Sequence, residues 1–290
     1  RRPPRSTLFP YTTLFRSERG HHVEVLEASS RAGGQVNLLT RNPRRKEMVG
    51  IVDWRLAELE RLGVSIHYDT YAGVDDVLGF DPDLVVIATG GIAQSPELEA
   101  GDDLVVSSWD ILAGSVKPEG PVLLYDDNGG HPGMSAAEII ANAGVELEVV
   151  SPERFFAPEM GGMNHVPYAK TFAENNVRVT INTKLVGVRR DGNALLATLG
   201  SDFSDVRVER RVAQVVVEHG TMANADLYLE LKPLSRNRGA VDYAALIERR
   251  DPLPIKDEAA RFDLVRIGDA VESRNVHAAI YDALRYCSLL

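Results

Sequence analysis

Apolar residues recur along the chain in two patterns that together predict an α/β fold. Residues 83–87, 213–218 and 263–267 are short apolar runs, which are typical of strands buried on both faces of a parallel sheet. Residues 47–62 instead place apolar side chains at helical spacing and end at Gly63, which predicts an amphipathic helix. Strands and helices that alternate in this way are expected to form a parallel sheet covered by helices.

The stretch 21–35 carries the first candidate site. It alternates polar and apolar residues up to Leu26, ends its strand at Glu27, and continues into a turn with Gly33 and Gly34. In a dinucleotide-binding unit, a carboxylate at the carboxyl end of a strand accepts hydrogen bonds from ribose hydroxyl groups. Such a unit begins with another strand and a GxGxxG turn roughly 20 residues upstream. The sequence shows neither there, so we expect a Rossmann-like domain whose first strand and turn are missing.

Residues 1–17 do not fit this pattern. Ser6–Phe9 is nearly repeated by Thr12–Phe15, and the segment has neither helical nor strand periodicity. It resembles the translated read-through of a sequencing adapter, so we exclude it from the fold and expect the authentic sequence to begin near Glu18, in the middle of a domain. A natural basic arm or a targeting peptide is the alternative.

Residues 121–151 repeat the strand–turn–helix–strand order of the first unit. We therefore predict two Rossmann-like three-layer domains, with the second inserted into the first. The first domain comprises residues 18–115 plus 224–290, and the inserted domain comprises residues 116–223. Within the inserted domain, residues 184–208 are expected to add successive strands joined by short turns.

Composition restricts the class of protein. The 290 residues suffice for about two domains, and 44% hydrophobic with 26% charged residues is typical of a globular protein. A net charge of −10 argues against nucleic acid and anionic membranes as partners, and no apolar run approaches the ~18 residues of a membrane span. The single cysteine, Cys287, excludes CxxC redox pairs, disulfides within the chain and cysteine-bound metal clusters. We predict no metal site and a cytoplasmic location.

Three features occur in the order expected of a flavoprotein. They are Glu27 with the following Gly33-Gly34-Gln35, the strand that ends in Ala88-Thr89-Gly90, and Ile267-Gly268-Asp269. Residues 18–290 resemble the C-terminal half of the Old Yellow Enzyme-related NADH:flavin oxidoreductases, which include 2,4-dienoyl-CoA reductase, trimethylamine dehydrogenase and N-methylproline demethylases. The resemblance is carried by ERGHHVEVLEASSRAGGQVNLLTRNPRRKEM, DPDLVVIATGG, RVAQVVVEHGTMANADLY and LVRIGDAVESRNVHAAIYDALR.

The resemblance implies that the chain is a fragment of an FAD-dependent oxidoreductase. In such enzymes an N-terminal barrel with FMN and a 4Fe–4S cluster carries out the substrate chemistry, and the half that resembles this chain binds FAD and relays electrons. The missing barrel is then the expected partner. The isolated chain is expected to be inactive and to hold no catalytic side chain. The alternative is a non-catalytic module that binds ADP and supports assembly.

The resemblance assigns residues to the ADP half of the cofactor. Glu27 would hold the adenosine ribose of FAD. Arg31, Gly34 and Gln35 would lie along the rest of the ADP half. A solvated strand end for Glu27 and a plain surface charge for Arg31 are the alternatives.

It also assigns residues to the flavin half. Thr89 and Gly90 would allow the backbone to approach the dinucleotide. Asp269 would accept hydrogen bonds from the ribityl hydroxyl groups, with Gly268 giving clearance. Asp269 could instead serve as the N-cap of the last helix.

The inserted domain departs from the pattern of a nicotinamide site. A dinucleotide phosphate is expected to meet the backbone N–H groups of a GxGxxG turn at a helix N-terminus. Here the turn reads DDNGGHPG, in which Asp126 and Asp127 oppose an anion and Pro132 lacks an N–H group. We therefore favour a structural module over NAD(P)H binding. The candidate residues for NAD(P)H are Asn128, Gly129 and Gly130.

Overall fold

A computed structural model describes residues 20–289. The adapter-like segment 1–17 lies outside these residues, so its exclusion from the fold stays a prediction. The chain divides into two compact units. Unit 1 comprises the described residues up to 37 together with 47–92 and 221–289, and unit 2 comprises 38–46 and 93–220.

These units divide the chain at other positions than the predicted domains. The predicted inserted domain begins at residue 116, whereas the main segment of unit 2 begins at Ala93, because β5 (Val106–Ser107) pairs in parallel with β12 (Gln214–Glu218). The segment 38–46 joins unit 2 through Asn42 and Arg44, whose side chains both donate hydrogen bonds to the buried Glu138 carboxylate. Which cofactor each unit binds stays a prediction.

Unit 1 is built on two pairs of parallel strands. β1 (Glu24–Leu26) pairs with β2 (Ser65–His67), and β3 (Leu84–Ile87) pairs with β14 (Asp263–Arg266). Parallel neighbours require a crossover connection. The crossover from β1 to β2 contains α2 (Gln35–Leu39), the 3-10 helix η1 (Pro43–Val49) and α3 (Gly50–Arg61).

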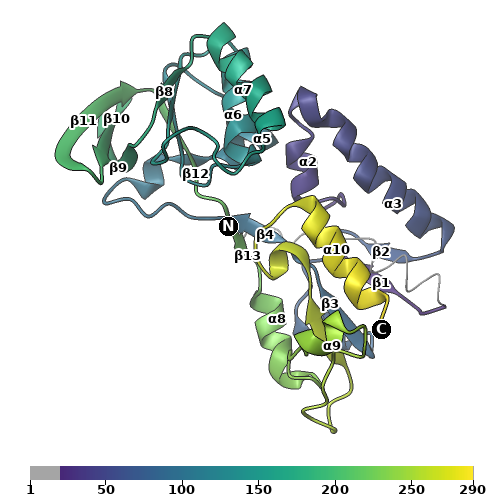
Figure 1. The fold of residues 1–290 in the computed structure, drawn as a ribbon. Coiled ribbons are helices and arrows are strands. Elements are labelled where there is room, and N and C mark those ends of the chain that lie inside the picture. Colours follow the sequence, from purple (N-terminus) through teal and green to yellow (C-terminus); the bar gives the residue numbers. More distant parts are fainter. Residues whose placement is uncertain (1–19, 290) are drawn as a thin grey trace. The chain divides into compact units, whose positions relative to one another are not determined.

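Alternate residues of β3 face different helices. Val85 and Ile87 pack with residues of α4 (Val74–Leu78) and α8 (Asp226–Leu231). Leu84 and Val86 pack with residues of α9 (Tyr243–Ile247) and α10 (Val276–Cys287), and Figure 1 shows α8 and α10 on different sides of β3. Because successive side chains of a strand point to opposite faces, the pair is covered on both faces, which accounts for its uninterrupted apolar sequence.

Unit 2 contains a five-stranded parallel sheet in the order β5-β12-β6-β7-β8. Its remaining strands are β6 (Val122–Asp126), β7 (Leu147–Val150) and β8 (Arg178–Thr180). A three-stranded antiparallel sheet follows β8, with β9 (Lys184–Asp191), β10 (Ala194–Ser201) and β11 (Ser204–Val212). The unit therefore holds the predicted strand–turn–helix–strand order and the predicted additional strands.

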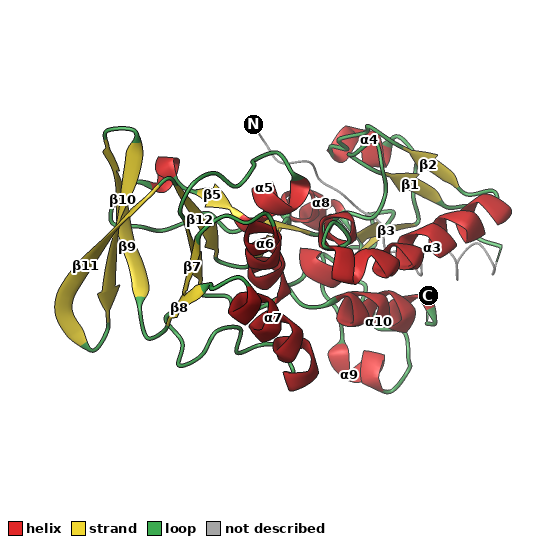
Figure 2. Cartoon of the chain, turned by 90° about the horizontal axis from the view of Figure 1, so that it is seen from above, coloured by secondary structure: helices red, strands yellow, loops and turns green. Residues whose placement is uncertain are grey.

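The parallel sheet of unit 2 lies between helices and the antiparallel sheet (Figure 2). Leu124 and Val216 pack with the helices α5 (Ser108–Ala113), α6 (His131–Asn142) and α7 (Gly162–Glu174). The adjacent residues Leu123 and Val217 pack with residues of β9 and β10. Since both faces are apolar, these strands also read as uninterrupted hydrophobic runs.

The α/β class with parallel strands is thus confirmed, while several short elements were missed. Residues 92–120 looked like an irregular connector but contain β5 and α5. The signal was present, because Ser107 and Asp110 form a capping box at the start of α5. Further short elements are β4 (Gly91–Ala93), which pairs with β13 (Thr221–Ala223), and the 3-10 helices η2 (Asp102–Leu104), η3 (Lys232–Leu234) and η4 (Gly268–Ala270).

Candidate functional site

The carboxyl ends of β3 and β14 bring two predicted segments of unit 1 to one sheet edge. The two strands are parallel and in register from Leu84 opposite Asp263 to Ile87 opposite Arg266. The backbone N–H of Ile267 then donates to the carbonyl of Ile87 at 2.9 Å. Thr89–Gly90 and Gly268–Asp269 follow these ends, so they share the edge where ligands of open α/β sheets bind.

The turn at Thr89 and Gly90 is fixed by the segment that follows β13. The buried hydroxyl group of Thr89 donates to the carbonyl of Asn224, and the N–H of Asn224 donates to the carbonyl of Gly90 at 3.0 Å. Gly90 has φ of +66°, a conformation that costs energy for residues with a Cβ. The Thr89 side chain therefore holds the backbone in place.

Asp269 and Gln35 meet across a long sequence separation. The amide Nε2 of Gln35 donates to Oδ2 of Asp269 at 3.0 Å, and the N–H of Arg274 donates to Oδ1 at 3.1 Å. Burial raises the pKa of Asp269, and these two hydrogen bonds oppose that shift. The N-cap of α10 is Asn275, whose side chain accepts from the N–H of Ala278, so the alternative role of Asp269 as that cap was wrong.

Asp282 and Arg274 support Gly268, and the sequence analysis identified neither of them. Gly268 has φ of +59°, and its N–H donates to Oδ2 of the buried Asp282 at 3.1 Å. The guanidinium group of Arg274 forms an ion pair with the same carboxylate. Asp282 lies on an amphipathic helix, where a carboxylate normally indicates a solvent-facing position, so its sequence carried no signal.

Glu27 lies at the end of β1, and its side chain is fully buried. The N–H of Ser29 donates to its Oε1 at 2.8 Å, while its backbone bonds to His67 and Thr70. The alternative of a solvated strand end was therefore wrong, because burying a carboxylate is costly and requires such partners. Its ribose contact stays a prediction.

The other residues assigned to the ADP half lie between β1 and α2. Arg31 is exposed. Gly34 has φ of +49° and immediately precedes Gln35, the first residue of α2. The structure thus joins Gln35 to Asp269, while the roles of Arg31 and Gly34 stay predictions.

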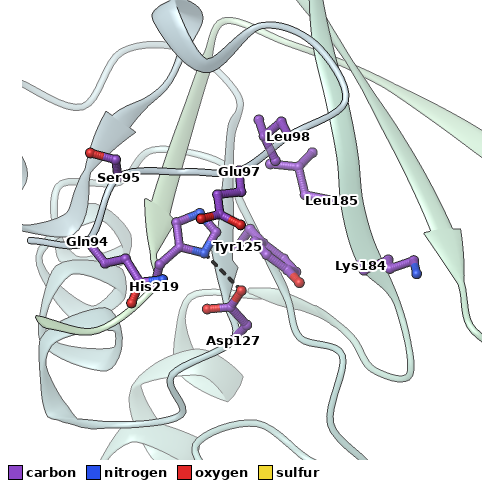
Figure 3. Close-up of a pocket in the computed structure, with 9 residues that line it drawn as sticks. All are labelled: Gln94, Ser95, Glu97, Leu98, Tyr125, Asp127, Lys184, Leu185 and His219. Carbon is purple, nitrogen blue, oxygen red and sulfur yellow. Dashed lines mark hydrogen bonds and ion pairs between the residues drawn. The ribbon is translucent and has the colours of Figure 1, made fainter. Parts of the chain in front are cut away.

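The candidate turn of unit 2 is stabilised by its own carboxylate. Oδ1 of Asp126 accepts the N–H groups of Asn128 at 3.1 Å and Gly129 at 2.8 Å, and Gly130 is the N-cap of α6. A cavity of about 290 Å³ lies beside this turn (Figure 3). In it, Nδ1 of His219 lies 2.8 Å from Oδ2 of Asp127. The residues that line it are Gln94, Ser95, Glu97, Leu98, Tyr125, Asp127, Lys184, Leu185 and His219.

Residues 20–289 show neither a membrane-spanning helix nor a cluster of metal ligands. None of the helices described there is long and apolar enough to cross a membrane. No group of three or more His, Cys, Asp or Glu side chains in this part of the chain could hold a metal ion.

Comparison with curated proteins finds relatives along almost the whole chain. It is 46% identical over 268 residues to the probable N-methylproline demethylase of Rhizobium meliloti, covering 92% of this chain and 40% of that protein. It is 40% identical to an N,N-dimethylglycine/sarcosine dehydrogenase of Chromohalobacter salexigens (93% and 41% covered). It is 38% identical to a multifunctional alkene reductase/demethylase of Caballeronia cordobensis (94% and 40% covered). The chain is thus similar to demethylases, dehydrogenases and reductases.

This chain spans about 40% of the length of these relatives.

Solved structures show the same fold. A 2-naphthoyl-CoA reductase matches with TM-score 0.77 and 24% identity, covering 96% of this chain and 37% of that one. A flavoprotein disulfide reductase of Escherichia coli matches with TM-score 0.59 and 16% identity, covering 95% and 67%. No family model matches the chain.

Proposed function

We propose that this chain is the nucleotide-binding part of a flavin-dependent oxidoreductase, with unit 1 as its FAD-binding domain. The observation that carries the proposal is the contact between Gln35 and Asp269 at the sheet edge of β3 and β14. It positions a carboxylate beside the turns at Gly90 and Gly268, both with positive φ. The similarity to reductases and dehydrogenases supports this function.

The residues of unit 1 fit a flavin dinucleotide. A carboxylate has about four acceptor positions, and the hydrogen bonds from Gln35 and Arg274 leave Asp269 able to accept ribityl hydroxyl groups as well. Glu27 lies at the carboxyl end of β1, where a dinucleotide-binding unit holds its ribose, and we propose it for the adenosine ribose on that ground. FAD would supply the redox chemistry when bound, and the protein groups bind and orient it.

We further propose that both units are Rossmann-like domains and that substrate chemistry lies outside this chain. The fold likeness to a flavoprotein supports the first point. The second follows from the resemblance, in which a barrel with FMN and a 4Fe–4S cluster precedes the part similar to this chain, and the relatives are more than twice as long. The barrel would be the partner of unit 1, and the cytoplasm the proposed location.

A second candidate function is an ADP-binding module without redox chemistry. It is favoured by the position of Glu27, whose carboxylate accepts the N–H of Ser29. An adenosine ribose held there need not have a flavin attached. The two functions differ at Asp269, because only FAD carries ribityl hydroxyl groups.

Calorimetric titration of the 290-residue chain with FAD and with ADP separates the two functions. We expect Asp269→Asn to weaken FAD binding by about tenfold or more, the effect of a hydrogen bond to a charged group, and to leave ADP binding unchanged. Asp53→Asn on the exposed part of α3 is the matched control and should change neither. Binding of ADP but not FAD would favour the second function. Because the first strand and its GxGxxG turn are expected to be missing, we expect this chain to bind FAD much more weakly than the longer protein does, and tight stoichiometric binding would contradict that expectation.

A further inference from the structure

The turn between β6 and α6 in unit 2 stands where a dinucleotide-binding unit meets a phosphate group. The backbone N–H groups of Asp127, Asn128 and Gly129 in this turn are already used by the protein. The N–H of Asp127 donates to the carbonyl of Glu218 at 3.2 Å. The N–H groups of Asn128 and Gly129 both donate to Oδ1 of Asp126. Three consecutive N–H groups are therefore bound to protein oxygens.

Carboxyl groups also fill the space beside the first turn of α6. A Cβ atom added at Gly133 would lie 2.8 Å from Oδ2 of Asp126 and 3.2 Å from Cγ of Glu218. Asp126 is only 1% exposed and Glu218 only 2% exposed. The adjacent Pro132 has no N–H to offer a ligand. Gly133, at the position of the third glycine of a GxGxxG turn, thus packs closely against the side chains of Asp126 and Glu218.

Hydrogen bonds hold Glu218 in this position. Its Oε1 accepts from Nδ2 of Asn128 at 3.1 Å and from the N–H of Gly220 at 3.0 Å. Its Oε2 accepts from the buried hydroxyl group of Ser108. The side of the turn is closed too, because a Cβ at Gly129 would lie 2.6 Å from Cδ of Pro158. A ligand could reach the N–H groups only by breaking several of these contacts.

We propose that the carboxyl group of Asp126 takes the place of a phosphate as the resident ligand of this turn, so that unit 2 does not bind nicotinamide dinucleotides there. A phosphate would have to displace Oδ1 of Asp126 and would lie beside Asp126, Asp127 and Glu218. Carboxyl groups repel an anionic phosphate whenever they are ionised.

The inference concerns unit 2 alone and does not require that unit 1 binds FAD. It is tested by 15N-resolved NMR on the 290-residue chain, which reports the amide groups of the turn separately from any ADP-like binding in unit 1. We expect NADH and NADPH to leave the signals of Asn128, Gly129 and Gly130 unshifted up to about 1 mM, the upper end of ordinary substrate affinities. A saturable shift of these signals at lower concentration overturns the proposal.

A pair of variants tests whether Asp126 is the group that closes the turn. Asp126→Ser removes the carboxyl group, so inorganic pyrophosphate should shift the signals of Asn128 and Gly129 in this variant but not in the unmodified chain. Asp126→Asn keeps an acceptor oxygen, so the turn should stay closed to pyrophosphate in this variant. A folded Asp126→Ser variant that gives no such shift overturns the role of Asp126. If this variant does not fold, the NADH titration of the unmodified chain still decides the proposal.

Discussion

Asp269 in unit 1 lies just beyond the parallel strand β14 and Asp126 in unit 2 ends the parallel strand β6, yet their surroundings differ. Asp269 accepts one bond from the Gln35 side chain and one from the N–H of Arg274, and it remains partly exposed. Asp126 is buried, and its Oδ1 is bound by two N–H groups of its own turn. Its Oδ2 has no hydrogen-bond partner among the described residues and lies against Gly133.

The difference shows that an acid at a strand end is not by itself a ligand site. A carboxylate at a strand end can bind a ligand only if it can still accept hydrogen bonds and if the adjoining N–H groups are still available. At Asp269 the protein contributes two donors and leaves room for more. At Asp126 and Glu218 the carboxyl groups satisfy backbone and side-chain donors of unit 2 instead.

The largest expected effect concerns Glu218 as a structural carboxylate. Glu218→Ala should destabilise the chain by about 3 kcal/mol, because it leaves buried donors of Ser108, Asn128 and Gly220 without an acceptor. Urea-induced unfolding measures this change. Glu209→Ala removes only an exposed ion pair with Arg189 and should cost less than about 0.5 kcal/mol. Equal effects of the two variants would contradict the structural role.

The fold class could be predicted because buried parallel strands have a distinctive sequence. Residues 83–87 and 263–267 were recognised as apolar runs, and both became strands of one pair. Their pairing could not be predicted, since it joins segments far apart in the chain. The start of α7 at Gly162 could not be predicted either, because it lies in a Gly-Gly sequence that resembles a loop.

The candidate site could be predicted only in part, for a similar reason. Gln35 and Asp269 were named by resemblance, but no periodicity in the sequence indicates that they touch across 234 residues. Asp282 and Glu218 were not identified, because an acid on a helix or at a strand end usually faces solvent. Asp126 was named as unfavourable for an anion, which stays a prediction. Its hydrogen bonds to its own turn depend on side-chain geometry that the sequence does not express.

The next largest effect is a dependence of the free energy of unfolding on pH, caused by Asp126 in unit 2. Burial is the main cause that raises the pKa of Asp126 to about 7, against an ordinary value of 3.8. Between pH about 4 and about 7 the folded state therefore binds a proton that the unfolded state does not. The resulting stabilisation is fully present below about pH 4 and is lost as the pH rises through about 7.

Asp126→Asn should remove this contribution, since an amide does not titrate in that range. The free energy of unfolding of the variant minus that of the unmodified chain should rise with pH, by at most about 1.4 kcal/mol per unit. Urea unfolding at several pH values between 4 and 8 measures the difference. Asp205→Asn, on an exposed strand, corrects for the general loss of charge. A difference that stays constant with pH would show that Asp126 is ionised throughout.

The smallest expected effect completes the comparison at Asp269. Asp269→Ala should change the free energy of unfolding by less than about 1 kcal/mol, because its donors on Gln35 and Arg274 can bind water instead. Urea unfolding beside Glu218→Ala gives the contrast directly. A loss as large as that of Glu218→Ala would mean that Asp269 stabilises the fold as Glu218 does. The two strand ends would then differ only in exposure, and the argument for a ligand at Asp269 would lose its structural basis.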